Sequence, residues 1–182
     1  MLKYNTEFLN NLAYVHFGVH PKSEPSGKIS VVQVKDIIDG SFNPNNVIRM
    51  PEAGLKERDF LRAGDVLFSG KGRITAMKWN NEGENVVASN SFFVIRVKKE
   101  RVLPEFLAAY LRSSSLKKEI GRKTKSSTVM HLSIEDVRDL RIPLPPIEEQ
   151  KKFARVAELL QEEKRMSEEI ILRKEKILNH LL

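Results

Sequence analysis

The chain has 182 residues, of which 41% are hydrophobic, so it can form one domain with a buried core, or one domain and an appendage. It has no cysteine, which excludes a disulfide framework and a cysteine-based zinc site and fits a reducing cytoplasm. We expect neither a secretory leader nor a membrane span, because no apolar run approaches the roughly 18 residues that a span needs. These limits predict a cytoplasmic protein.

The net charge of +7 is unevenly distributed along the chain. From residue 148 to the last residue there are eight Lys or Arg and eight Glu, so the whole excess lies in residues 1–147. A basic region favours a polyanionic partner such as nucleic acid, because each neutralised phosphate releases a counterion. A merely basic protein is the alternative, and charge alone puts nucleic acid only slightly ahead.

Short apolar runs, separated by Gly, Pro, Asn and Ser, fill the first hundred residues. They predict strands at 12–17, 29–34, 66–68, 74–79, 86–88 and 91–98. The apolar period then changes from 2 to 3.6. Helices are expected at 105–112, 116–120 and 134–139, the last with Ser133 as its N-cap, before an extended segment at 140–144. The sequence therefore predicts an α+β globule of short strands and helices.

A long C-terminal helix follows Pro143-Leu144-Pro145-Pro146, since no Gly or Pro interrupts the rest of the sequence. Pro146 suits the first position of a helix, and the two Glu after Ile147 complement the positive end of the helix dipole. A helix over 147–181 is about 52 Å long, which is too long to pack on one small domain. We therefore divide the chain into a globular domain at 1–145 and a long helix at 146–182.

A sparse apolar stripe runs along this helix with spacings of three, four and seven, as in a coiled coil. The positions that we expect in a dimer interface are Phe153, Val156, Leu160, Ile170, Ile177 and Leu181. The middle of the stripe, around Glu163 and Ser167, is polar, which indicates either a polar-cored pair or a gap. The pattern predicts a coiled-coil-like homodimer; a helix folded back on its own globule is the alternative.

The sequence shows no catalytic centre. His16 and His20 are four apart, but Phe17 and Gly18 between them indicate a strand and a loop rather than one helix face, so we predict no metal site. The segment 70–72, Gly-Lys-Gly, lacks the upstream Gly and the following Ser or Thr of a phosphate-binding loop. No Ser/His/Asp or paired-carboxylate pattern stands out. We predict a protein that is not an enzyme and holds no cofactor.

Binding features are better represented, in loops at 18–28, 69–73, 78–81 and 122–131. Each loop combines Lys or Arg with Ser, Thr, Asn or small residues, which contact phosphates and in some cases read base edges. Trp79 lies in the third loop and is expected to be an exposed aromatic side chain. For any single loop residue a solvated side chain is the alternative, but four such loops on one basic domain favour nucleic-acid binding.

Four segments appear in an order that is known from one family. They are 31–37 (Val-Val-Gln-Val-Lys-Asp-Ile), 61–68 (Leu-Arg-Ala-Gly-Asp-Val-Leu-Phe), 126–133 (Ser-Ser-Thr-Val-Met-His-Leu-Ser) and 142–150 (Ile-Pro-Leu-Pro-Pro-Ile-Glu-Glu-Gln). Together they resemble the target-recognition domain and the conserved helix of the specificity subunit of type I restriction-modification systems. Such a subunit normally carries two recognition domains and two helices, so this chain resembles a half-subunit.

The resemblance implies a subunit without catalysis of its own. Members bind a bipartite DNA sequence, dock modification subunits that methylate adenine with S-adenosylmethionine, and assemble with restriction subunits that cleave DNA using ATP and magnesium. We therefore predict a sequence-specific DNA-binding half-subunit that homodimerises through 147–182 on a split palindrome. The predicted DNA contacts are Lys22, Lys28, Lys71, Arg73, Lys78, Asn80, Arg122, Lys123 and Lys125.

Three alternatives come from other functional classes. The chain could hold modification subunits without reading DNA, or act as a stand-alone DNA-binding regulator. A restriction enzyme with its catalytic part on the same polypeptide ranks last, because the sequence shows no nuclease or methyltransferase motif.

Overall fold

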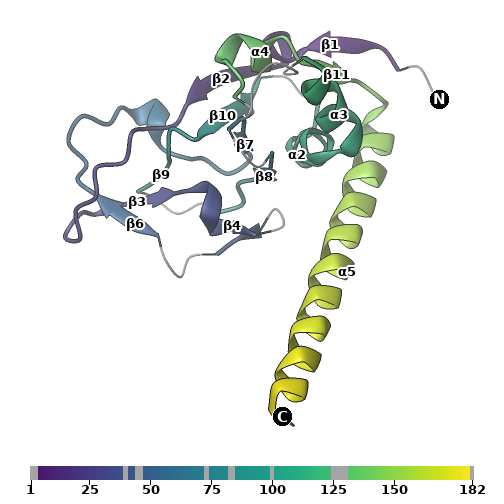
Figure 1. Cartoon of the computed structure of the whole chain (residues 1–182). Helices are drawn as coiled ribbons and strands as arrows, with labels where there is room; N and C mark the ends of the chain where they lie inside the picture. The colour runs from purple at the N-terminus through teal and green to yellow at the C-terminus, as the bar shows by residue number, and fades with distance from the viewer. Residues whose placement is uncertain are drawn as a thin grey trace.

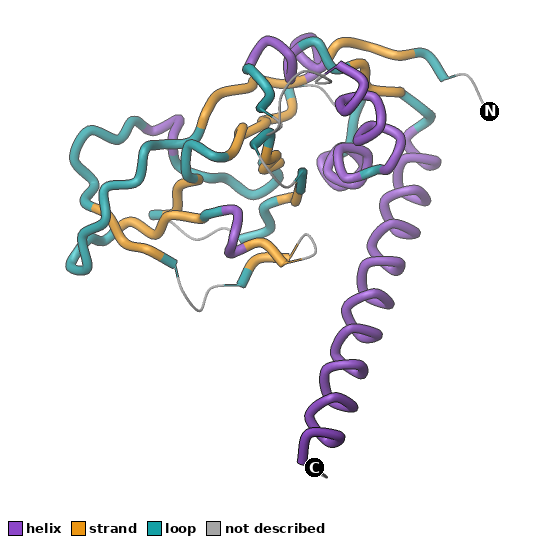
Figure 2. Tube along the Cα trace, viewed as in Figure 1, coloured by secondary structure: helices purple, strands orange, loops and turns teal. Residues whose placement is uncertain are grey.

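The computed structural model describes residues 4–38, 41–43, 47–71, 74–81, 85–98, 101–123 and 131–180. These residues form a globule of short strands and helices, and a single long helix projects from one side of it (Figure 1). Figure 2 shows how short the strands are compared with the connecting loops. The α+β fold with a long C-terminal helix is the fold that the sequence predicts, and it is confirmed.

The elements follow one another closely along the chain. The described strands are β1 (Thr6–Phe8), β2 (Ala13–Phe17), β3 (Ile29–Val32), β4 (Ile37–Ile38), β5 (Ser41–Phe42), β6 (Ile48–Met50), β7 (Val66–Ser69), β8 (Ala76–Lys78), β9 (Val86–Ala88), β10 (Phe92–Val97) and β11 (Arg141–Pro143). The described helices are α1 (Leu9–Leu12), α2 (Pro104–Arg112), α3 (Ser114–Lys123), α4 (Ile134–Arg138) and α5 (Ile147–His180), with 3₁₀ turns η1 (Val34–Asp36) and η3 (Glu57–Asp59).

The centre of the globule is an antiparallel sheet with the strand order β2-β10-β7-β8. Its central strand β10 is the most strongly apolar run of the sequence, and Phe92, Phe93, Val94 and Ile95 are all buried. Helix α2 covers one face of this sheet, where Leu107 packs in the same cluster as Phe68. Since both faces of the sheet are covered, apolar side chains occupy consecutive positions rather than alternate ones.

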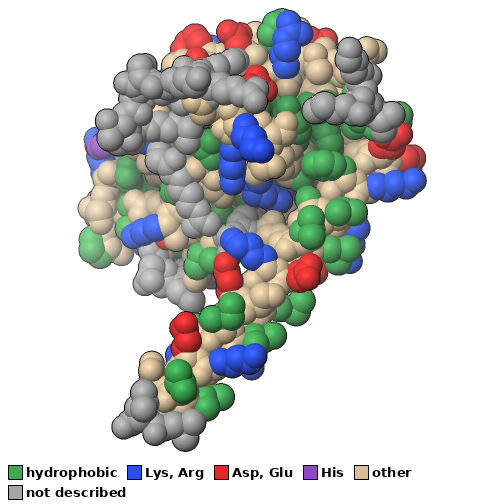
Figure 3. Space-filling view, turned by 45° about the vertical axis from the view of Figure 1, so that its right-hand side comes forward, with side chains coloured by type: hydrophobic (Ala, Val, Ile, Leu, Met, Phe, Trp, Pro, Cys, Tyr) green, Lys and Arg blue, Asp and Glu red, His purple; other side chains and the backbone are tan. Residues whose placement is uncertain are grey.

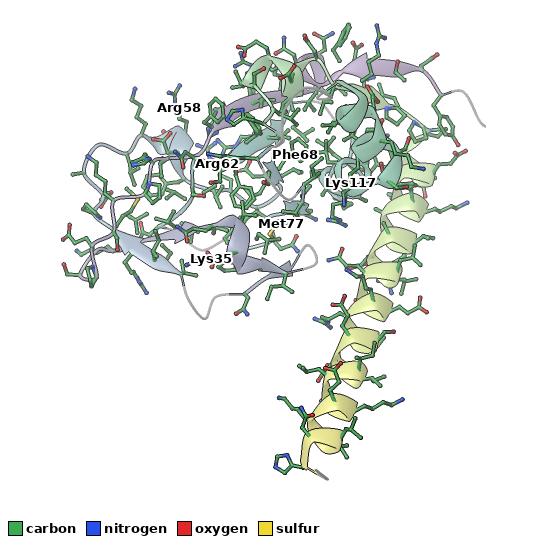
Figure 4. The ribbon with its side chains drawn as sticks, in the orientation of Figure 1. Lys35, Arg58, Arg62, Phe68, Met77 and Lys117 are labelled. Carbon is green, nitrogen blue, oxygen red and sulfur yellow. The ribbon has the colours of Figure 1, made fainter. Side chains whose placement is uncertain are left out.

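The other face of the sheet packs on a second core, built around Trp79, Met77 and Leu67. A smaller sheet, β6-β3-β9, borders it, with β3 parallel to β9. Phe68 and Met77 are buried in the globule, whereas Lys35, Arg58 and Arg62 are exposed; Figure 4 labels all five. The interior of the globule therefore consists of several apolar clusters, and Ala154 of the long helix joins the largest of them.

Most predicted elements are present, with shifts at their ends. The run 29–34 leaves the strand conformation after Val32, because Asp36 accepts a hydrogen bond from the backbone N–H of Gln33 at 2.8 Å and closes a 3₁₀ turn. Ser133 caps α4 as predicted: its Oγ accepts from the N–H of Asp136 at 3.0 Å. Helix α5 begins at Ile147, the first residue of the predicted range, and the Pro146 carbonyl accepts from the N–H of Gln150 at 3.0 Å.

The prediction that Trp79 is exposed is wrong, because its side chain is only 1% exposed. The residue follows β8 directly, and its N–H donates to the carbonyl of Asp65 at 2.7 Å. This backbone bond turns the indole into the second core, where its ring centroid lies 5.1 Å from that of Phe42. Its polar sequence neighbours, Lys78 and Asn80, led to the wrong expectation, because they gave no sign that the position at the end of β8 is buried.

The start of α5 is fastened to the globule through Gln150, whose side chain is fully buried. Its amide nitrogen donates to the carbonyls of Arg101 (2.8 Å) and Pro145 (2.9 Å), and its amide oxygen accepts from the N–H of Leu103 (2.9 Å). Phe153, one turn further on, meets Phe106 of α2 edge to face at 5.4 Å between ring centroids.

Beyond this attachment, α5 leaves the globule. Among its described residues, Gln150 and Ala154 are buried, and every residue from 162 to 180 is exposed. The helix therefore does not fold back on its own globule. The proposed division at residue 145 coincides with the start of α5, although the independence of the two parts stays a prediction. Within the described residues, no helix is both long and apolar enough to cross a membrane.

Candidate nucleic-acid interface

The register of the central sheet separates the predicted DNA-binding loops into two groups. Phe17, Phe93 and Phe68 lie side by side, so the loops after β2 and β7 leave from the same end of the sheet. Lys78 pairs with Val66, at the opposite end. The loops at 18–28 and 69–73 therefore start together, and the loop at 78–81 lies apart from them.

The first group carries three predicted residues with exposed side chains, Lys22, Lys28 and Lys71. Lys71 forms a β-bridge with His131, and the N–H of Leu132 donates to the carbonyl of Gly70 at 2.9 Å. Gly70 allows this approach, because a Cβ there would lie 2.5 Å from the ring of Phe93. The end of the 122–131 loop is thus held against the 69–73 loop, which the sequence could not show.

Four predicted residues cannot be placed with their side chains. Arg73 and Lys125 lie outside the described residues, and Arg122 and Lys123 end α3 without described side chains. Their role in DNA binding stays a prediction.

The loop at 78–81 borders a cleft of about 460 Å³ between the globule and α5. We name this cleft the helix cleft. Its lining residues are Ile38, Lys78, Asn80, Glu105, Ala108, Arg112, Lys151, Ala154, Arg155, Glu158, Gln161, Glu162 and Arg165. Asn80 is exposed there, whereas Lys78 is partly buried and forms an ion pair with Glu105 at 3.5 Å. The free energy of that pair would oppose a move of Lys78 to a phosphate.

The helix cleft mixes five basic and three acidic side chains. Figure 3 shows Lys and Arg side chains in the hollow where the globule meets the upper part of α5. Arg112 donates to the carbonyl of Ala76 at 2.7 Å, and burial lowers the pKa of its guanidinium. Arg155 is paired with Glu158 on its own helix at 2.7 Å. These pairings make the cleft a mixed polar surface rather than a uniform anion site.

Sequence reasoning missed a second basic surface, a pocket of about 340 Å³ over β2, which we name the basic pocket. Arg58, Arg96, Lys98 and Arg138 reach it from η3, β10, the segment after β10, and α4. Among its described lining residues none is acidic. The alternation of Arg96 and Lys98 at the end of a strand was the available signal, and it places both on one face of the sheet.

Most of the polar groups of the basic pocket already have protein partners. Arg96 makes a two-pronged ion pair with buried Asp65, at 2.8 and 2.7 Å. Lys98 donates to the carbonyl of Asn10 at 2.8 Å and lies 4.4 Å from the centre of the Tyr14 ring. Arg138 donates to the carbonyl of Val15 at 3.2 Å. These three cations thus stabilise the fold, and their charge adds to the basic character of the globule.

His16 and His20 lie where the sequence predicted, in β2 and the loop after it. Nδ1 of His16 is 2.9 Å from the carbonyl of Phe17, to which a protonated Nδ1 donates, and the amide of Asn90 lies 3.3 Å from Nδ1 of His20. In the part of the chain that the structure describes, no three His, Asp or Glu side chains gather as a metal site would.

Five of the predicted interface residues on α5 carry exposed apolar side chains. The exposed fraction runs from 43% for Phe153 to 63% for Ile177, with Val156, Leu160 and Ile170 between them. Leu181 lies outside the described residues. Figure 3 shows apolar side chains along α5 below the globule. The apolar surface on α5 is therefore real, while the dimer itself stays a prediction.

Comparison with known families shows which class of protein this fold belongs to. Residues 10–171 match the family described as the type I restriction modification DNA specificity domain. The chain belongs to this family, and the resemblance found in the sequence is confirmed. A DNA specificity domain is a recognition component, so the prediction of a non-catalytic chain is confirmed as well.

Two curated relatives are type I restriction enzyme specificity subunits. The EcoBI subunit of Escherichia coli is 27% identical over 144 residues, which is 78% of this chain and 30% of the relative. The HindI subunit of Haemophilus influenzae is 25% identical over 128 residues, covering 67% of this chain and 28% of the relative. The chain thus spans less than a third of the length of either relative.

Solved structures of the same kind share the fold. The HsdS subunit of Thermoanaerobacter tengcongensis aligns with a TM-score of 0.63 at 20% identity, over 88% of this chain and 37% of that one. A chain from a study of complex assembly and conformational transition of the type I restriction-modification system aligns with a TM-score of 0.70 at 19% identity, over 98% and 43%. The projecting helix is included in such an alignment, since nearly the whole chain is covered.

Proposed function

We propose that this chain reads one half of a bipartite DNA target with its globule and uses α5 to join a second copy. The observation that carries the proposal is the division of the molecule into a basic globule and a neutral helix with an exposed apolar stripe. DNA belongs to the first surface and a protein partner to the second. The family match supports the DNA part independently.

Lys22, Lys28 and Lys71 are the described residues that best fit phosphate contacts. They are exposed and lie on loops that leave one end of the central sheet, so one duplex could reach them together. Phosphate contacts fix the position of a protein on DNA but do not read the sequence. Base reading would then fall to other loop side chains at the same end of the sheet.

A homodimer of two-fold symmetry would place one globule at each end of a pair of antiparallel helices. Its target should be a palindrome divided by a spacer of unspecified sequence. We propose that modification and restriction subunits dock on such a dimer. The two relatives are named as specificity subunits of type I restriction enzymes, which supports an assembly of several subunits.

Selection from a random DNA library tests the proposal with the full-length chain. We expect two inverted half-sites at a fixed separation. An undivided site without symmetry would overturn the half-subunit proposal and favour a stand-alone regulator. Loss of all sequence preference, with modification subunits still captured, would favour the interaction module.

Lys71→Ala tests the phosphate contacts. It should weaken binding to specific and random DNA alike and reduce the slope of log K against log salt by about one. Lys176→Ala, near the far end of α5, is the matched control and should leave the slope unchanged. Equal slopes for the wild type and Lys71→Ala would remove this residue from the interface.

A further inference from the structure

The apolar stripe of α5 contains charged positions in a regular pattern. Alternate steps of three and four residues give one continuous row, which we name the seam: Phe153, Val156, Leu160, Glu163, Ser167, Ile170, Lys174, Ile177 and Leu181. The described side chains of the seam are exposed from Phe153 to Ile177. Such spacing is that of positions a and d of a coiled coil, where one polar or charged residue commonly fixes the register of the two helices.

The seam faces away from the helix cleft. At 100° per residue, its mean direction lies about 160° around the helix from that of the residues of α5 that line the helix cleft. A second helix on the seam would therefore not enter the cleft, although Phe153, at the start of the seam, contacts Phe106 of α2. The two sides of α5 are free to serve different partners.

Two antiparallel registers bring most of the seam of one copy against the seam of another copy. In one register Leu160 faces Ile177 of the other copy, and in the alternative register Leu160 faces Ile170. The two differ by seven residues, one heptad, and each aligns the same number of seam positions. Apolar contacts alone therefore do not choose between them.

Charge does choose. With Leu160 facing Ile177, Glu163 of each copy faces Lys174 of the other, so both charges of the seam have an opposite partner. With Leu160 facing Ile170, Glu163 faces Ser167 and Lys174 faces Val156. Neither charge then faces an opposite charge in the seam of the other copy.

We propose that a Glu163–Lys174 pair between two copies of this chain sets the register of the antiparallel helices, with Leu160 facing Ile177. This inference rests on the proposed homodimer and adds its geometry. It accounts for the polar middle of the stripe: the charges reduce stability compared with an apolar seam but exclude the alternative register.

The register also determines how far apart the two globules lie. The symmetry axis falls between residues 168 and 169, so the two ends at Ile147 are about 64 Å apart along the helices. The other register would bring them about 10 Å closer, which corresponds to roughly three base pairs of DNA. The charge pair would thus set the spacer length of the DNA target.

Charge reversal of the full-length chain tests the pair. Glu163→Lys alone and Lys174→Glu alone should each weaken the homodimer by roughly tenfold or more, because like charges then face each other twice. A mixture of the two variants should restore dimerisation as a heterodimer, since each lysine at one position meets a glutamate at the other. Glu168→Lys, which lies outside the seam, is the control. A mixture that dimerises no better than the single variants would overturn the register.

Cross-linking distinguishes failure of the register from failure of the dimer. Because the chain has no cysteine, introduced thiols are the only ones present. Oxidation of a mixture of Leu160→Cys and Ile177→Cys chains should give a covalent heterodimer, whereas Leu160→Cys with Ile170→Cys should not. The reverse result would keep the dimer and overturn the register. A wild-type chain that light scattering finds monomeric at micromolar concentration would overturn both.

Discussion

The globule and the projecting helix of this chain stabilise themselves in opposite ways. In the globule, apolar side chains such as Leu107 and Phe92 are fully buried in clusters that the chain completes by itself. On α5, side chains of the same kind, such as Leu160 and Ile177, remain about 60% exposed. Apolar side chains are thus buried in the globule and exposed on α5, and this difference supports the proposal that α5 associates with a partner.

The largest expected effect comes from a Leu→Ala substitution, compared between the globule and α5. Leu107→Ala should reduce the free energy of unfolding by about 2 to 5 kcal/mol, because it leaves a cavity in the core under α2. Leu160→Ala should hardly change the unfolding of the globule but should weaken self-association.

Denaturant unfolding and analytical ultracentrifugation, each over a range of protein concentrations, measure the two effects. An equal loss of stability from both substitutions, independent of concentration, would mean that Leu160 is buried in the single chain.

Asp65→Ala should reduce the free energy of unfolding by about 3 kcal/mol, because it removes one partner of a largely buried ion pair. Asp65 also raises the pKa of Arg96 by accepting its hydrogen bonds. The substitution removes this effect, but a guanidinium stays protonated in proteins, so the charge of Arg96 is left without its carboxylate partner. Asp59→Ala is a close control: Asp59 accepts from the N–H of Lys56 at 2.8 Å, as Asp65 accepts from that of Arg62 at 2.9 Å.

The Asp59 carboxylate pairs instead with an exposed guanidinium, that of Arg58 at 3.8 Å. Its loss should therefore cost about 1 kcal/mol. Similar unfolding midpoints in urea for the two variants would show that the pair with Arg96 contributes little.

Gln150→Ala should reduce the free energy of unfolding by about 2 kcal/mol, since it leaves the carbonyls of Arg101 and Pro145 and the N–H of Leu103 without their partner. The substitution acts where the two regions join, so it should also loosen the direction of α5. Thermal unfolding and small-angle scattering measure the two consequences. Gln161→Ala, further along the same helix, should change neither.

The smallest expected effect is on the pH dependence of stability, and it involves Tyr110 of α2. Burial, and to a lesser extent the charge of Glu119, raises the pKa of Tyr110. The folded state thus holds the phenol proton more tightly, so this contribution to stability is complete below about pH 10 and is lost as the pH rises through the raised value.

Tyr110→Phe should flatten the decline of stability between pH 9 and 11. The pKa of Tyr4 is also raised, chiefly by its hydrogen bond to Glu149, and its part of the decline should remain. Parallel curves of unfolding free energy against pH for the variant and the wild type would assign the decline to other groups.

Local patterns predicted most of the elements correctly, because periodicity and capping act over a few residues. The apolar run of β10, the N-cap at Ser133 and the uninterrupted helix after Pro146 needed no tertiary information. Position in the core was harder to predict. Trp79 was expected at the surface because its sequence neighbours are polar, while a backbone bond to Asp65, fourteen residues earlier, turns it inward.

The candidate interface shows the same limit. The sequence shows the basic loops, but strand pairing decides which of them lie together. It places Lys78 at the opposite end of the sheet from Lys71, and it brings His131 next to Lys71. The basic pocket was missed because Arg58, Arg96 and Arg138 come from three distant segments. Contacts between distant segments leave no short motif to detect.

The sequence by itself determined the neutral charge of α5, its length, its apolar stripe and its family, because each follows from residue type and local spacing. Only the tertiary structure decided that α5 leaves the globule, that its seam turns away from the helix cleft, and that Gln150 fastens the two regions together. The physical reason is that burial and direction depend on which distant groups meet: the three hydrogen bonds of the Gln150 amide and the contact of Phe153 with Phe106 both hold the start of α5 on the globule.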